Sequence, residues 1–286
     1  MTGVFSLLAV LVYFICSLFI YSTSALFIFT GIFCVFFLLI ILVEYYKGDK
    51  IVLSMNHAQL ADDRKYRVLH DTVEGMAIAA GIPKPKVYII EDPAPNAFAT
   101  GRAPECASVA VTTGLLQTMN KLELEGVIAH ELSHIKNYDV RFMTLVVVVV
   151  GLIAMISNTF LRAGFSGMFR GMGSSNNKNS GAAIIIILVI TIILAILTPI
   201  IAKLIQFAIS RKREYLADAS GALLTRYPKG LADALEKIKG ANLSTKTANA
   251  ATAALYTASP VSGSHISRWF DTHPPLEDRS AKLRAM

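Results

Sequence analysis

The chain has 286 residues, of which 54% are hydrophobic, with a mean hydropathy of +0.53 and a net charge of +7. This apolar share exceeds that of a soluble globular domain and predicts a membrane protein. Three cysteines, two of them within apolar stretches, argue against a disulfide framework or a thiolate metal site. No combined basic and aromatic pattern indicates a nucleic-acid partner, so we assign the positive excess to attraction between the chain and anionic lipid headgroups of a bilayer.

The first 43 residues carry no charge and predict a transmembrane hairpin. Two apolar stretches, about 4–20 and 25–43, are separated only by Tyr21–Ser24. Each is about long enough to cross the hydrocarbon core of a bilayer. A cleaved signal peptide is the alternative, but the start lacks a basic region and the first stretch leads directly into a second.

Residues 44–141 form the first polar segment, which we expect to begin the catalytic domain. The stretch DDRKYRVLHDTVEGMAIAAGIPKPKVYII predicts an amphipathic helix closed by Gly81, followed by a strand near Val87–Ile90. A second strand is predicted at Ser108–Thr113. NAFATG, residues Asn96–Gly101, lies between them and on its own residues fits a plain β-turn as well as a strand.

The stretch VIAHELSHIKNYD places two histidines four residues apart, with Glu131 beside the first. On a helix, His130 and His134 share one face, so both imidazoles can bind one ion, which is the H-E-x-x-H pattern of zinc peptidases. Asn120 followed by Glu123 predicts the start of this helix. An apolar stripe should anchor it: Leu124, Ile128, Leu132 and Ile135. These residues alone leave open an ordinary helix that carries two histidines.

Residues 142–202 predict a second transmembrane hairpin, with spans at 142–161 and 182–202 joined by the outer loop 162–181. Lysine and arginine are concentrated at the span ends opposite this outer loop. The side of the membrane at those ends should therefore be cytosolic. The chain then returns to that side for its second polar segment, 203–286.

A third metal ligand should follow the fourth span on the cytosolic side. The stretch SRKREYLADASGALL offers Glu214 there, and Asp218 one helical turn later. Two histidines and a carboxylate leave a fourth position for water, as catalytic zinc requires. Asp218 would accept the outer ring N–H of a ligating histidine. The alternative is a solvated face on which both carboxylates pair with Arg211 or Arg213.

The remainder of the segment gives weaker signals. Residues 240–264 are rich in Ala, Thr and Ser and predict a mobile loop or lid. In WFDTHPPLEDR, the two prolines hold His273 in an extended conformation before a short C-terminal helix.

Four motifs in this order resemble the HtpX-type membrane-bound zinc metalloproteases, relatives of the CAAX prenyl endopeptidases and of mitochondrial quality-control proteases: NAFATG, HELSHIKNYD, SRKREYLAD and THPPLEDR. The resemblance covers nearly the whole chain. It implies that His130, His134 and Glu214 bind zinc and that Glu131 is the catalytic glutamate. It also implies that His273 reaches the active site, as a donor to the oxyanion. Finally, it implies that an edge strand pairs with extended substrate through Asn96, Ala97, Phe98 and Ala99.

We therefore expect a mainly α membrane protein with four transmembrane helices and a cytosolic α+β catalytic domain of the zincin-like (gluzincin) type, built from residues 44–141 and 203–286. The expected activity is zinc-dependent endopeptidase cleavage of misfolded or damaged membrane proteins at the bacterial inner membrane, with one Zn²⁺ per chain. Glu131 would take the proton of the attacking water. Two alternatives remain at this point: a protease for a specific substrate, such as a lipidated C-terminus, and a non-proteolytic membrane scaffold with structural zinc. The oligomeric state is not predicted.

Overall fold

The computed structural model describes residues 13, 17, 22–148, 211–241, 243, 245, 252, 255–257 and 274–286. Its elements, in chain order, are α2 (Thr23–Met55), β1 (Gln59–Leu60), α3 (Arg67–Ala80), β2 (Lys86–Ile90), β3 (Ala97–Thr100), the 3₁₀ turn η1 (Pro104–Cys106), β4 (Ser108–Thr112), α4 (Thr113–Thr118), α5 (Lys121–Lys136), α8 (Arg211–Thr225), α9 (Pro228–Ala241) and α11 (Leu276–Arg284).

The chain divides into two compact units, residues 1–44 with 149–201, and residues 45–148 with 202–286. In the first unit, the described part is chiefly the first two thirds of α2, which contains the stretch 25–43. None of the helices that the structure describes combines the length and the apolar character needed to cross a membrane. Residues 4–12, 149–161 and 182–202, which hold most of the other three predicted spans, lie outside the described residues. The four-span arrangement therefore stays a prediction.

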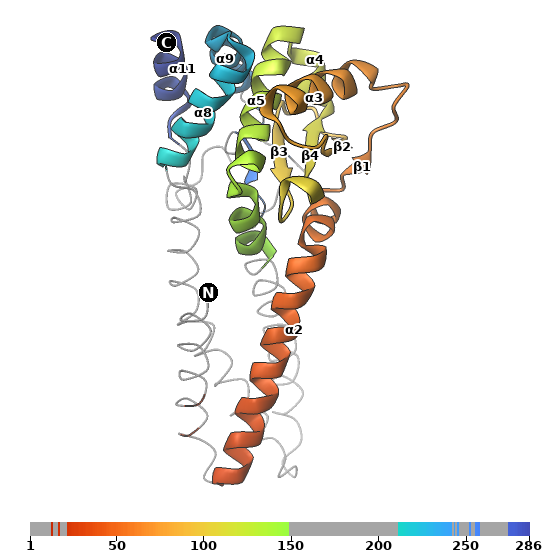
Figure 1. Ribbon diagram of the computed structural model, residues 1–286, viewed down its shortest axis with the longest axis vertical. Helices are drawn as coiled ribbons and strands as arrows, with labels where there is room; N and C mark the ends of the chain where they lie inside the picture. The colour runs from red at the N-terminus through yellow and green to blue at the C-terminus, as the bar shows by residue number, and fades with distance from the viewer. Residues whose placement is uncertain are drawn as a thin grey trace, which may run out of the picture. The chain divides into compact units, whose positions relative to one another are not determined.

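The second unit is built around α5. This helix contacts α3 and β3, and it also contacts α8 and α9, while α11 packs on α9 and α8 (Figure 1). The predicted apolar stripe of α5 is buried, since Leu124 is 5% exposed and the other three residues are fully buried. The predicted start is confirmed as well, because Asn120 and Glu123 form a complete capping box.

Four strands form one sheet in the order β1-β2-β4-β3. β2 and β4 are parallel, with Val87 opposite Val109, and β3 is antiparallel to β4, with Ala97 opposite Val111. Both strands predicted from the sequence are present, and Gly81 ends α3 at φ 69° as predicted. NAFATG is not a plain turn, since its residues Ala97–Thr100 form β3, which lies at one edge of the sheet.

The helix expected in the stretch that begins at Asp62 starts only at Arg67. The carboxylate of Asp62 accepts hydrogen bonds from the backbone N–H groups of Arg64 and Lys65, which fixes a separate turn before the helix. Downstream, α5 and α9 cross at Gly126, whose missing side chain allows the backbone of Leu231 to approach closely. This crossing fixes the axial position of α5 in the unit.

Candidate metal centre and active site

Three potential metal ligands converge from two helices that are distant in the sequence. His130 and His134 lie one turn apart on α5, and Glu214 lies in the first turn of α8. One ligand atom from each lies within 4.8 Å of the other two, and all three side chains are buried. Among the described residues, this is the one group of histidine, cysteine or carboxylate side chains with metal-binding geometry.

The distances among the ligand atoms suit a tetrahedral ion. His130 Nε2 lies 3.2 Å from His134 Nε2, and His134 Nε2 lies 3.4 Å from Glu214 Oε1. Zinc–nitrogen bonds of about 2.0–2.1 Å at tetrahedral angles separate two nitrogen atoms by roughly 3.3 Å. The His130 Nε2 to Glu214 Oε2 distance is longer, at 3.8 Å. The donor set therefore fits a zinc ion with little adjustment.

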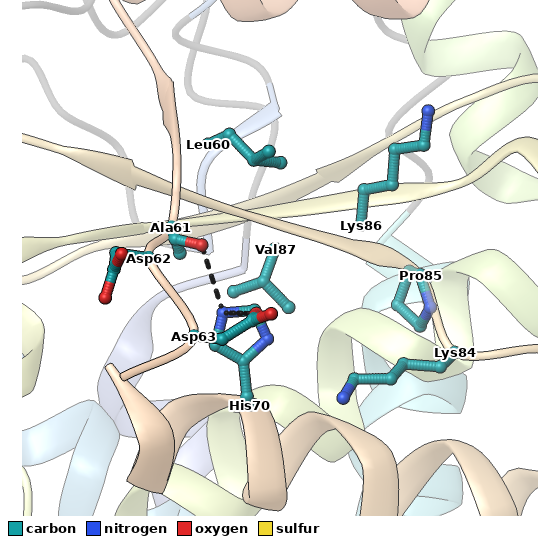
Figure 2. A pocket seen from close by; sticks show the side chains of 9 residues that line it. All are labelled: Leu60, Ala61, Asp62, Asp63, His70, Lys84, Pro85, Lys86 and Val87. Atoms are coloured by element: carbon teal, nitrogen blue, oxygen red, sulfur yellow. Dashed lines mark hydrogen bonds and ion pairs between the residues drawn. The ribbon is translucent and has the colours of Figure 1, made fainter. Parts of the chain in front are cut away.

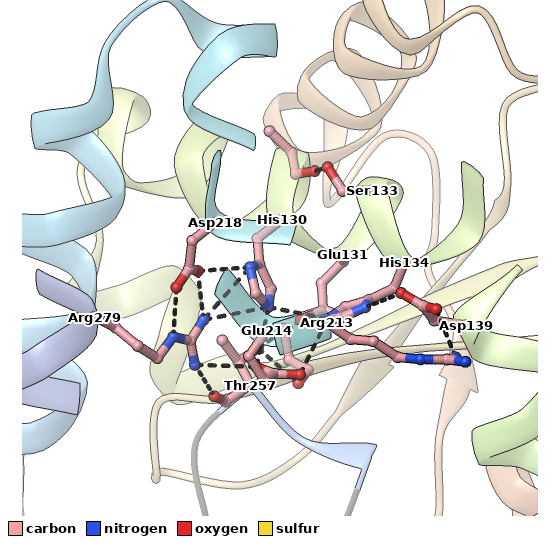
Figure 3. Close-up of polar contacts among 12 residues, drawn as sticks. His130, Glu131, Ser133, His134, Asp139, Arg213, Glu214, Asp218, Thr257 and Arg279 are labelled. Carbon is pink, nitrogen blue, oxygen red and sulfur yellow. Dashed lines mark hydrogen bonds and ion pairs between the residues drawn. The ribbon is translucent and has the colours of Figure 1, made fainter. Parts of the chain in front are cut away.

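The other ring nitrogen of each histidine contacts a carboxylate (Figure 3). Asp218 Oδ1 lies 2.9 Å from His130 Nδ1, and Asp139 Oδ2 lies 3.1 Å from His134 Nδ1. A ring N–H that donates to a carboxylate leaves the Nε2 lone pair for a metal ion. Asp218 therefore contacts His130 as expected of a carboxylate that orients a ligating imidazole. Asp139 makes the equivalent contact with His134.

Each of these carboxylates is in turn paired with an arginine. Asp218 accepts from Arg279 through both oxygens, at 2.9 Å from Nε and 2.7 Å from Nη2, while Asp139 accepts from Arg213 Nη1 at 2.8 Å. The two pairs differ in environment, since the Arg279 side chain is fully buried and that of Arg213 is 43% exposed. Arg213 therefore pairs with Asp139 rather than with Glu214 or Asp218.

Burial and neighbouring charge act in opposite directions on the titration of these groups. Burial lowers the pKa of His134, but the hydrogen bond to Asp139 and the charges of Glu214 and Glu131 outweigh it and raise that pKa to about 9. Burial likewise raises the pKa of Asp218, but the charge of Arg279 and the contact with His130 lower it to about 2. Without a metal ion, the site therefore holds a proton on His134.

The buried charges also favour a divalent cation. Glu131, Glu214 and Asp218, counted as carboxylates, and Arg279, counted as a cation, together carry a charge of about −2 when both histidines are neutral. Asp139 and Arg213 cancel each other. Two uncompensated negative charges are costly to bury, and a bound divalent cation would neutralise both. The chemistry of the donor set and its charge therefore both fit zinc.

Glu131, the expected general base, is 2% exposed and lies next to the ligands on α5. Its Oε1 accepts a hydrogen bond of 2.7 Å from Thr257 Oγ1. Thr257 Oγ1 is also 3.0 Å from Ala97 O, which accepts the Thr257 N–H at 2.9 Å. The hydroxyl has one proton, and the carboxylate of Glu131 is both the nearer and the charged acceptor, so we assign that proton to Glu131.

The predicted substrate-binding residues Asn96–Ala99 lie at the edge of the sheet, and two of them contact the segment that holds Thr257. Thr257 pairs with Ala97, and the Phe98 ring meets the ring of Tyr256 edge-on at 5.0 Å. In an antiparallel pair, alternate residues direct their backbone groups away from the partner strand, so Ala99 faces outward like Ala97. Asn96 is buried, with its amide 3.4 Å from Thr245 Oγ1.

Four residues around the centre were not assigned from the sequence: Asp139, Arg213, Thr257 and Arg279. Of these, Arg279 carries a signal that would have identified it. It lies three residues after Leu276 and four before Leu283, on the face of α11 that packs inward, where an arginine needs a buried partner. His273 lies outside the described residues, as does most of 240–264.

A separate pocket of about 430 Å³ lies between the start of α3 and strand β2 (Figure 2). Its lining includes His70, whose Nε2 is 3.2 Å from Asp63 Oδ1 and 3.3 Å from Ala61 O. Lys84 and Lys86 also line it. These contacts join the chain after β1 to α3, and none of the lining residues belongs to the metal centre.

Curated relatives match most of the chain. It is 47% identical over 253 residues to "Protease HtpX homolog" of Dictyoglomus turgidum, which covers 87% of this chain and 80% of the relative. It is 48% identical over 252 residues to the protein of the same name from Listeria monocytogenes serotype 4a, covering 86% and 83%. These relatives carry the name of the family that the four motifs resemble.

A solved structure supports the same fold. The crystal structure of S. mikatae Ste24p is similar with a TM-score of 0.52 at 20% identity, over 88% of this chain and 57% of that one. At this identity the likeness concerns the fold alone. Residues 63–286, which include every residue of the metal centre, match the family described as Peptidase family M48. The chain therefore belongs to peptidase family M48.

Proposed function

We propose that this peptidase is a zinc-dependent endopeptidase of the bacterial inner membrane that cleaves misfolded or damaged membrane proteins on the cytosolic side. The observation that carries the metal-dependent part is the convergence of His130, His134 and Glu214, with the carboxylate of Glu131 beside them. The apolar composition and the distribution of lysine and arginine support the membrane location.

The roles of the side chains follow from their contacts. His130, His134 and Glu214 would hold the zinc ion, which supplies a Lewis acid for the scissile carbonyl and lowers the pKa of a water molecule toward neutrality. Glu131 takes the proton of the attacking water and returns it to the leaving amine. Asp218 and Asp139 keep both imidazoles oriented, so that their Nε2 lone pairs face the ion.

Strand β3 supports a preference for unfolded substrate. An extended peptide can add to the edge of the sheet through outward-facing backbone groups such as those of Ala99, which requires no particular side chain. A helix cannot pair in this way, because its backbone groups are already satisfied. Selection of extended segments without sequence preference suits the removal of misfolded proteins. The Thr257 N–H occupies the carbonyl of Ala97 in the structure, so substrate would pair with the outward-facing groups of Ala99 while Thr257 stays in place.

The ligand count argues for catalysis over a scaffold with structural zinc. A structural zinc site is closed by four protein ligands, whereas a catalytic site has three and an open position. Within the part of the chain that the structure describes, the group has three ligands. Nothing in the described site favours a lipidated C-terminus as the substrate.

The test separates the base from the ligands. We expect Glu131→Gln to retain zinc and lose nearly all cleavage of casein in detergent or liposomes, because the variant lacks a proton acceptor but keeps every ligand. Glu214→Ala should lose both zinc and cleavage. Zinc content measured on the purified variants is the second readout, and equal loss of zinc in both would refute the assignment. Cleavage of an unfolded cytosolic loop and of the same loop on the outer side, compared in liposomes, tests the orientation.

A further inference from the structure

Among the residues that the structure describes, Arg279 is the buried cation beside the metal centre, and the mechanism above gives it no role. Its guanidinium is fully buried and donates twice to Asp218, through Nε and Nη2. Asp218 in turn contacts His130 Nδ1 at 2.9 Å. This bidentate pair fixes the plane of the carboxylate, and therefore the direction in which the imidazole of His130 presents Nε2.

The same guanidinium has a second branch that leads to the base. Its Nη1 donates to Thr257 O at 2.9 Å, and the hydroxyl of Thr257 donates to Glu131 Oε1 at 2.7 Å. Nη1 also lies 3.4 Å from Glu214 Oε2. Its Nη2 lies 3.4 Å from His130 Nδ1 and 3.3 Å from His130 Nε2. One rigid planar group therefore contacts two metal ligands, His130 and Glu214, the carboxylate that orients His130, and the residue that donates to Glu131.

We propose that Arg279 is a positioning residue that fixes the metal ligands and Glu131 relative to each other, through Asp218 on one side and Thr257 on the other. This inference rests on the proposed function. The requirement for arginine follows from geometry, because three donors in one plane reach Asp218 and Thr257 together, whereas the single ammonium of lysine does not reproduce the fork. A purely structural arginine would need only charge compensation for Asp218, which lysine also supplies.

The matched control lies on the same helix. Arg284 of α11 pairs with Asp233 and Glu236 of α9 on the surface and is remote from the metal centre. Arg284→Gln removes an arginine and its ion pairs from α11 and contacts none of the site residues. It should therefore match the wild type in metal affinity and turnover, and it reports any general effect of loosening α11.

The experiment compares full-length wild type, Arg279→Lys and Arg284→Gln in detergent. Zinc affinity is measured by competition with a chelator, ligand geometry by the absorption spectrum of the cobalt-substituted protein, and kcat and KM with an unstructured peptide. For Arg279→Lys we expect a loss of zinc affinity of roughly 10 to 100-fold, an altered cobalt spectrum, and a fall in kcat of similar size with KM unchanged. The lysine variant keeps the buried charge, so it avoids the unfolding that Arg279→Met risks.

The second branch is tested separately with Thr257. Thr257→Val should keep zinc affinity and lose kcat, and Thr257→Ser, which restores the hydroxyl, should recover kcat. The inference is overturned if Arg279→Lys matches Arg284→Gln in affinity, spectrum and kcat, even when its thermal stability is lower. It is also overturned if Thr257→Val is as active as Thr257→Ser. Failure of the wild type to bind zinc or to cleave would instead refute the proposed function.

Discussion

Replacing Gly126 by alanine tests the crossing of α5 and α9 that places the ligand helix. An added Cβ would lie 2.7 Å from Leu231 N and 2.9 Å from Leu231 Cα, whereas nonbonded carbon atoms prefer about 3.5–4.0 Å. The two helices must therefore separate by on the order of 1 Å. Since the obstructing atoms belong to the backbone of α9, no change of side-chain rotamer relieves the contact.

The magnitude follows from two opposing terms. Alanine is favoured over glycine in a helix by about 1 kcal/mol, whereas overpacking a close contact costs about 1–3 kcal/mol. A contact with backbone on this scale belongs at the upper end, so we expect Gly126→Ala to lower the free energy of unfolding by about 2 kcal/mol. In a domain of this size that corresponds to a fall in Tm of roughly 4–8 °C.

Gly75 of α3 provides the control, because an added Cβ there meets nothing within 4 Å. Gly75→Ala should therefore stabilise the protein by up to about 1 kcal/mol. Thermal unfolding of both variants and the wild type in the same detergent, without metal, measures the difference. A Tm for Gly126→Ala equal to or above that of Gly75→Ala would refute the reasoning.

Two further predictions concern the cap of α5 and the proton on His134. Asn120→Ala removes the side-chain acceptor of the capping box and should cost about 1 kcal/mol of stability, and an unchanged Tm would contradict this. The pKa of His134 is raised from 6.5 to about 9, so the proton stabilises the metal-free protein fully below about pH 6.5, and this contribution is lost as the pH rises through 9. A metal ion must displace that proton, so zinc affinity should rise by up to about tenfold per pH unit until about pH 9 and then level off. Affinity that does not vary between pH 6.5 and 9 would refute this assignment.

The sequence predicts well those features that local chemistry determines. The start of α5 follows from Asn120 and Glu123, and its buried face follows from the spacing of four apolar residues, so both were predictable without tertiary information. Glu214 was found because two histidines on a helix require a third ligand, which the expected topology placed in a short stretch. That stretch holds few candidates.

The residues that the sequence did not reveal depend on packing between distant segments. Thr257 acquires its role only because its segment pairs with Ala97 and reaches Glu131, and its own neighbourhood has no periodicity to indicate this. Asp139 follows the end of α5 and reaches His134 only through the turn at Tyr138, whose φ is +59°. Such a turn has no strong signature in a residue other than glycine or asparagine.

Because the metal centre is divided between α5 and α8, its residues are synthesised at different times. A ribosome makes α5 first, with His130, Glu131 and His134 in place, but Glu214 and Asp218 follow only after residues 149–210. Until then, the nascent chain lacks a carboxylate ligand and the partner that orients His130. It therefore has no complete metal site while residues 149–210 are being synthesised. A peptidase made in this order has its full set of metal ligands only after this long segment has been added.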